Sequence, residues 1–114
     1  MKRLMVGVLA LAALSLSAAQ DRQPSKQTFT GIVTDSMCAT GDHSRMQMGP
    51  TDADCTRACI SAHGASYVLY DGKNVYTLSD QKTPERFAAQ KVRVVGTLDA
   101  KTKTIQVESI SAAK

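Results

Sequence analysis

Five short segments of the chain alternate apolar and polar residues with a period of two, which is typical of half-buried β-strands. The clearest case places Val92 and Val94 on one side of a strand and Lys91 and Arg93 on the other. The five segments span residues 28–35, 66–70, 75–78, 91–98 and 104–110. Residues 71–74 have the composition of a hairpin turn between the second and third segments. The pattern therefore predicts a mainly β domain.

One helix is predicted over residues 52–63, between the first and second strands. Thr51 followed by Asp54 resembles a capping box, with Asp in place of the usual Glu or Gln. Gly64 stands where a helix commonly ends, because glycine adopts the left-handed conformation at that position without strain.

A second helix, about two turns long, is predicted from Thr83 as N-cap and Pro84 as the first helical residue, with Phe87 and Ala88 facing the core. Five strands with a helix between the third and the fourth is the arrangement of an OB-fold barrel, which closes its own sheet edges. The sequence thus predicts a five-stranded OB-like barrel with a Cys-rich helical insertion after the first strand. A generic five-stranded α+β sandwich is the alternative.

The first nineteen residues have the pattern of a secretory signal peptide. A basic start at Lys2 and Arg3 precedes an apolar run over residues 4–16 and a small-residue stretch over 17–19. The apolar run is shorter than the roughly 20 residues that cross a bilayer. We expect cleavage before Gln20, a periplasmic or secreted protein with no membrane span after cleavage, a flexible leader over residues 20–27 and the domain over 28–114.

Charge and aromatic content argue against nucleic acid as a partner. The chain carries a formal charge of +4, and loss of Lys2 and Arg3 with the signal peptide leaves +2. The charges are scattered, and the chain has no Trp and few other aromatic residues on which bases could stack. A protein or a small ligand is the expected partner.

All side chains that can bind a soft metal through thiolate or imidazole lie between residues 38 and 63. They are Cys38, His43, Cys55, Cys59 and His63. Soft sulfur with imidazole selects Zn or Cu(I). The predicted metal ligands are therefore the thiolates of Cys38, Cys55 and Cys59 and the imidazole of His43, with Zn or Cu as the cofactor.

His63 ranks lower as a ligand. Cys55, Cys59 and His63 form an i, i+4, i+8 stripe on the predicted helix, and the outer two are about 12 Å apart at 1.5 Å per residue. Met46 and Met48 lie near the cluster, where adaptable apolar surface is the favoured interpretation and soft copper ligation the alternative.

Two other interpretations of the cluster stay open. In an oxidising compartment Cys38 could form a disulfide with Cys55 or Cys59 and leave one thiol over. The protein would then be a disulfide-stabilised module that binds a protein or an envelope ligand. A thiol enzyme or redox protein is a further alternative, with Cys38, His43 and Asp42 as the nucleophile set, but the chain lacks a Cys-x-x-Cys motif and an evident oxyanion loop. A non-enzymatic domain is favoured.

Several segments together resemble a known group of proteins. They are residues 31–38, His43, residues 54–59 with the Cys-x-x-x-Cys pair, and residues 67–69, 92–96 and 105–110. The chain resembles small exported bacterial proteins of uncharacterised function, including DUF5818-type sequences, with an OB-like β-barrel. The resemblance covers most of residues 28–110. It implies that Cys38, His43, Cys55 and Cys59 act as one unit, either as a metal site or as a disulfide staple.

Overall fold

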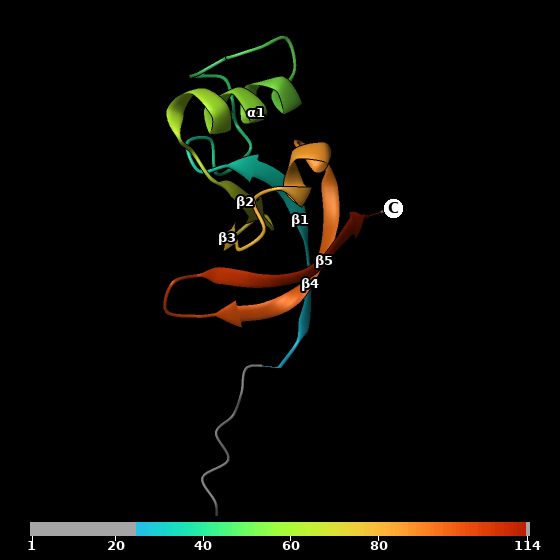
Figure 1. Ribbon diagram of the computed structural model, residues 1–114. Coiled ribbons are helices and arrows are strands. Elements are labelled where there is room, and N and C mark those ends of the chain that lie inside the picture. The colour runs from blue at the N-terminus through green and yellow to red at the C-terminus, as the bar shows by residue number, and fades with distance from the viewer. Residues whose placement is uncertain (1–24, 114) are drawn as a thin grey trace, which may run out of the picture.

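The computed structural model describes residues 25–113 and shows a mainly β domain with a five-stranded sheet and one α-helix (Figure 1). The elements in chain order are β1 (Gln27–Asp35), α1 (Asp52–His63), β2 (Tyr67–Tyr70), β3 (Val75–Leu78), the 3-10 helix η1 (Thr83–Phe87), β4 (Lys91–Asp99) and β5 (Thr104–Ala112). Each predicted strand is present, with ends that differ by at most two residues. The predicted signal peptide and residues 20–24 of the predicted leader lie outside the described residues.

The sheet pairs its strands in a closed order, so that β1 contacts both β2 and β4. The order is β1-β2-β3-β5-β4, and β4 pairs back onto β1. Four of the five pairings are antiparallel. The pairing of β3 with β5 is parallel and joins Thr77 to Thr104 and Leu78 to Ile105. Each strand therefore has a partner on both sides, which leaves few backbone groups to pair with other chains.

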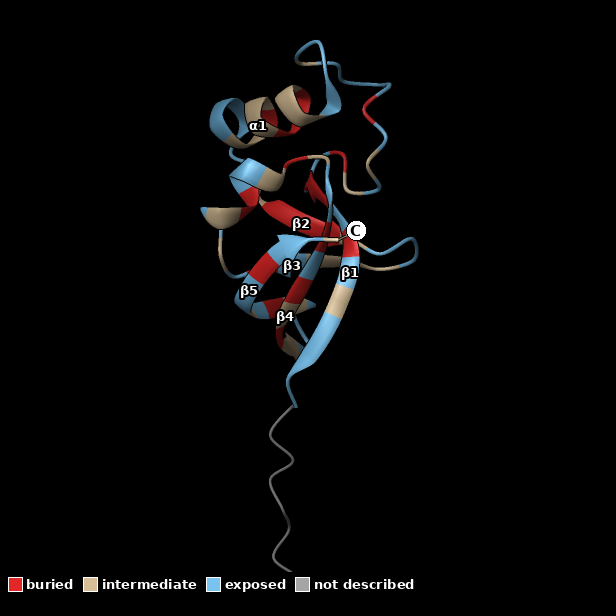
Figure 2. Ribbon diagram, turned by 90° about the vertical axis from the view of Figure 1, so that its right-hand side faces the viewer, coloured by how far each residue is buried: buried red, intermediate tan, exposed pale blue. Residues whose placement is uncertain are grey.

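The hydrophobic core lies inside this ring of strands. It is formed by Val33, Tyr67, Leu69, Leu78, Val92, Val94, Ile105 and Ile110, all buried. Figure 2 shows the buried segments along the strands and on α1. The predicted alternation of β4 is confirmed, because Val92 and Val94 are buried while Lys91 and Arg93 are exposed. Full burial of such a side chain contributes about 1.5–3 kcal/mol, so the strand pattern supplies most of the apolar stabilisation.

Helix α1 begins and ends where the sequence predicts. The backbone N–H of Asp54 donates to the Thr51 hydroxyl at 3.1 Å, and that hydroxyl donates to the Asp54 carboxylate at 2.9 Å. Gly64 is left-handed (φ 66°, ψ 22°), and its N–H donates to the Cys59 carbonyl. The helix packs over the end of β1 (Figure 1) and buries the side that carries Cys55, Thr56 and Cys59.

The second helix is a 3-10 helix of five residues and is shorter than the two turns predicted. The prediction of Thr83 as its N-cap is wrong, because Lys82 is the N-cap and Thr83 is the first helical residue. Its start is stabilised by Asp80, whose Oδ1 accepts the backbone N–H groups of Lys82 and Thr83 at 2.9 and 3.0 Å. It ends early because Ala89 adopts a left-handed conformation (φ 62°) and donates its N–H to the Val33 carbonyl at 2.8 Å. Phe87 packs against the core, and the adjacent Ala88 is buried as predicted.

We expect Asp80→Asn to reduce the loss of stability in acid. Hydrogen bonds, first from Thr83, lower the pKa of Asp80 below its ordinary value of 3.8. A lowered folded-state pKa contributes stability that is present above pH 3.8 and is lost as the pH falls through the folded-state pKa. Urea unfolding at pH 6 and pH 3 measures this contribution. The variant should lose less stability between the two pH values than the natural chain, and an equal loss would contradict the assignment.

Candidate metal centre

Three buried side chains of different chemistry converge beyond the end of β1. Asp35, Cys38 and His43 each offer one ligand atom, and these atoms all lie within 4.8 Å of one another. Asp35 is fully buried, and Cys38 and His43 are 8% and 6% exposed. The group contains a carboxylate, a thiol and an imidazole, which is the donor set that zinc accepts in proteins.

Hydrogen bonds close to β1 hold Cys38 in position. Asp35 Oδ1 accepts the backbone N–H groups of Met37 at 3.0 Å and Cys38 at 2.9 Å. The Thr34 hydroxyl donates to the Cys38 carbonyl at 2.8 Å. These bonds form a tight turn in which the Asp side chain replaces a backbone acceptor. The last residues of a rigid strand therefore orient both the carboxylate and the thiol.

Two polar atoms of the group are buried and have no hydrogen-bond partner among the described residues. They are Asp35 Oδ2 and His43 Nδ1. The other ring nitrogen of His43, Nε2, faces the Thr56 hydroxyl at the long distance of 3.5 Å. Buried polar atoms without partners are uncommon, and each costs about 1–3 kcal/mol. A ligand that takes both lone pairs removes this cost.

The two cysteines of α1 lie beside this group. Both are buried, and Cys55 donates its thiol hydrogen to the Met46 carbonyl at 2.9 Å. Neither belongs to the group whose ligand atoms lie within 4.8 Å of one another, so that group contains Cys38 and His43 but not Cys55 and Cys59 of the four predicted ligands. All three cysteines are free and buried, and no disulfide is present within residues 25–113. The structure thus buries all three predicted thiols and joins none of them.

Burial raises the pKa of two of the thiols, Cys38 and Cys59, and so favours their protonated form. It is the largest cause of the raised pKa of Cys38, and the nearby Asp35 carboxylate and Cys55 raise it further. Burial, followed by Asp35, raises the pKa of Cys59 to about 11. Because the thiolate is the reactive form, these cysteines are poor nucleophiles in the absence of a cation.

Three interpretations of the sequence change with the structure. Asp35 was missed as a ligand, although it stands three residues before Cys38 in the Asp-x-x-Cys pattern. His63 is exposed at the end of α1 and lies outside the group. Asp42, the acid of the alternative nucleophile set, is exposed and accepts the Ser44 N–H at 2.9 Å instead of joining Cys38 and His43.

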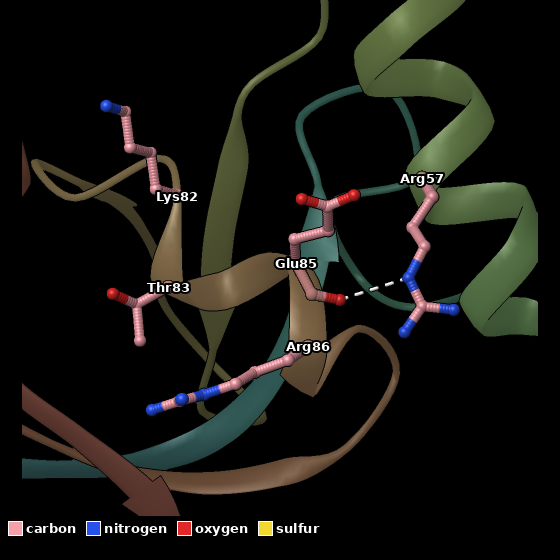
Figure 3. Close-up of a pocket in the computed structure, with 5 residues that line it drawn as sticks. All are labelled: Arg57, Lys82, Thr83, Glu85 and Arg86. Carbon is pink, nitrogen blue, oxygen red and sulfur yellow. Dashed lines mark hydrogen bonds between the residues drawn. The ribbon is translucent and has the colours of Figure 1, made fainter.

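A hollow of about 500 Å³ lies between α1 and η1, and the residues that line it include no Cys or His. Its lining residues are Arg57, Lys82, Thr83, Glu85 and Arg86. Figure 3 shows that the three basic side chains extend in different directions, with Arg57 Nε donating to the Glu85 carbonyl at 3.0 Å. That bond fixes α1 to η1, so Arg57 has a structural partner. The candidate metal site is therefore the group formed by Asp35, Cys38 and His43.

Fold and site together define a small β domain with a buried Asp/Cys/His centre between its sheet and its helix. Comparisons with protein-family models, with curated proteins and with solved structures gave no match. Within residues 25–113, neither helix has the length and apolar content needed to span a bilayer.

Proposed function

We propose that the chain is an exported, non-catalytic domain with an OB-like barrel, and that it binds one zinc ion through Asp35, Cys38, His43 and Cys55. The observation that carries this proposal is the pair of buried, unpartnered atoms, Asp35 Oδ2 and His43 Nδ1, beside the Cys38 sulfur. We take Cys55 as the fourth donor because it is buried on the side of α1 that packs over the end of β1. It lies outside the group of atoms within 4.8 Å of one another, so its side chain has to move toward the ion.

The donor spacing supports zinc as the metal. Zinc bonds of about 2.0–2.3 Å in a tetrahedral site separate neighbouring donor atoms by roughly 3.3–3.8 Å. The ligand atoms of Asp35, Cys38 and His43 lie within 4.8 Å of one another. Movements of about 1 Å, which small side-chain rotations provide, would bring these three atoms to zinc-binding distance. Calcium and magnesium are disfavoured because they prefer oxygen ligands throughout.

Charge also supports a cation at this position. Within the described residues, the ion pairs are Lys26 with Glu108 and Arg57 with Asp54, so the fully buried Asp35 has no basic partner there. A bound dication neutralises a buried carboxylate and allows the neighbouring thiols to lose their protons. The Thr56 hydroxyl then accepts the Nε2–H of His43, which fixes the tautomer in which Nδ1 is free to bind.

Four protein donors leave no open coordination position, which is typical of structural zinc sites and not of catalytic ones. The ion would connect the end of β1 with α1 and so fix the insertion, residues 36–66, to the sheet. The closed strand order and the parallel pairing of β3 with β5 support the OB-like assignment. The signal-peptide pattern of residues 1–19 supports export to the periplasm or the medium.

Zinc analysis of single variants tests the site. We expect one zinc ion per chain in protein purified from the periplasm. His43→Gln and Asp35→Asn should each lower zinc affinity about 100-fold or more. Loss of a residue that only hydrogen-bonds to a metal ligand already lowers metal affinity about 10–100-fold. The measurement is a competition titration against a chromophoric zinc chelator, with elemental analysis of the purified protein.

Two matched variants serve as controls. His63→Gln and Asp42→Asn change the same residue types at exposed positions of the insertion and should keep the affinity of the natural chain. Full zinc affinity in His43→Gln would refute the proposed ligand set.

The alternative function is a disulfide-stabilised module that binds a protein or an envelope ligand. It is favoured by the three free, buried cysteines of the insertion, of which Cys38 would pair with Cys55 or Cys59. Intact mass of the exported protein separates the two functions, because a disulfide removes two hydrogens. Zinc-free protein with that mass would establish the alternative.

A further inference from the structure

A methionine thioether lies against the innermost cysteine of α1. Cys59 is fully buried, and its sulfur is 4.0 Å from the sulfur of Met48, on the loop that precedes the helix. The same loop also contacts Cys55, whose thiol donates a hydrogen bond to the Met46 carbonyl. These two contacts hold the loop against the side of α1 that carries Cys55 and Cys59.

The distance between these two sulfurs is that of two ligands on one ion. Metal–sulfur bonds of about 2.3 Å place two sulfurs roughly 4.0 Å apart when three donors surround an ion in a plane. Thioether with thiolate is a soft donor pair that selects Cu(I) over zinc, whose usual protein ligands are Cys, His and carboxylates. Cys55, one helical turn before Cys59 on the same side, supplies a third sulfur.

We propose that Met48, Cys59 and Cys55 form a second site, specific for a soft monovalent cation such as Cu(I), next to the zinc position. Cys55 is the one donor that the two proposed sites would share. Asp35 and His43 take no part in the soft site, and Met48 takes no part in the zinc site. The two sites are therefore separable by substitution.

Substitution of Met48 tests the soft site without removing a zinc ligand. Cu(I), delivered anaerobically as its bicinchoninate complex, is titrated into zinc-loaded protein. We expect Met48→Leu, which keeps the side-chain volume, to lower Cu(I) affinity roughly tenfold or more and to leave the zinc content unchanged. Cys59→Ser should abolish Cu(I) binding at this site.

Met46→Leu is the matched control, because Met46 belongs to the same loop, accepts the Cys55 thiol through its carbonyl and has an exposed side chain. It should bind Cu(I) as the natural chain does. Unchanged Cu(I) affinity in Met48→Leu, or release of one zinc ion for each Cu(I) bound, would overturn the second site. Protein that lacks zinc but binds Cu(I) in a Met48-dependent way would refute the zinc site alone.

Discussion

Removal of zinc is expected to lower the free energy of unfolding by roughly 3–4 kcal/mol relative to protein at free zinc 100 to 1,000 times the dissociation constant. Binding to the folded chain alone stabilises it by this amount, because the unfolded chain does not hold Asp35, Cys38 and His43 together. For a domain of this size, such a change lowers the melting temperature by about 15 °C. Thermal unfolding with excess zinc and with EDTA measures the difference.

Asp35→Asn provides the control for this experiment. The variant lacks the buried carboxylate, so its metal-free form should be at least as stable as the metal-free natural chain. It should also melt at nearly the same temperature with zinc and with EDTA. A natural chain whose melting temperature does not respond to zinc would contradict the proposed site.

Gly31→Ala is expected to lower the free energy of unfolding by about 2–3 kcal/mol, the upper part of the range for overpacked positions. An added Cβ would clash with the Tyr70 carbonyl oxygen and lie 3.1 Å from Leu69 Cγ. Strand β1 cannot move away from β2, because Gly31 is also paired with Val92 of β4. Urea unfolding of the variant measures the loss.

The matched substitution is Gly64→Ala at the end of α1. No atom lies within 4 Å of the Cβ position there, so only the left-handed backbone resists the change. Its expected cost is about 1 kcal/mol. Equal losses of unfolding free energy in the two variants would show that the close approach of β1 to β2 at Gly31 does not add to the cost of the substitution.

Much of the framework follows from local patterns. The alternation of Val92 and Val94 with charged residues predicted β4, and Thr51 and Gly64 predicted both ends of α1. These signals depend on neighbours within a few positions, since side-chain direction in a strand and capping at a helix end are short-range properties. The length of η1 was not predictable in this way, because it depends on a bond between Ala89 and Val33 of β1.

The sequence predicted only some of the residues that form the site. The sequence grouped Cys38, His43, Cys55 and Cys59, since no other segment carries comparable donors. It did not predict Asp35 as a ligand, because an aspartate at the end of a strand is usually exposed and forms a turn. Asp35 does form that turn through Oδ1, and the packing of the insertion buries its second oxygen.

The five strands, the helix with its two caps and the segment that carries the thiols could all be predicted from local periodicity or composition. Three features of the site depend on the packing of the whole domain: His43 is buried while His63 is exposed, a carboxylate oxygen of Asp35 lies near Cys38 and His43, and Met48 lies against Cys59. Those outcomes depend on how a long loop folds back onto a helix and a closed sheet. The energy of such packing comes from contacts between segments that are distant in the chain.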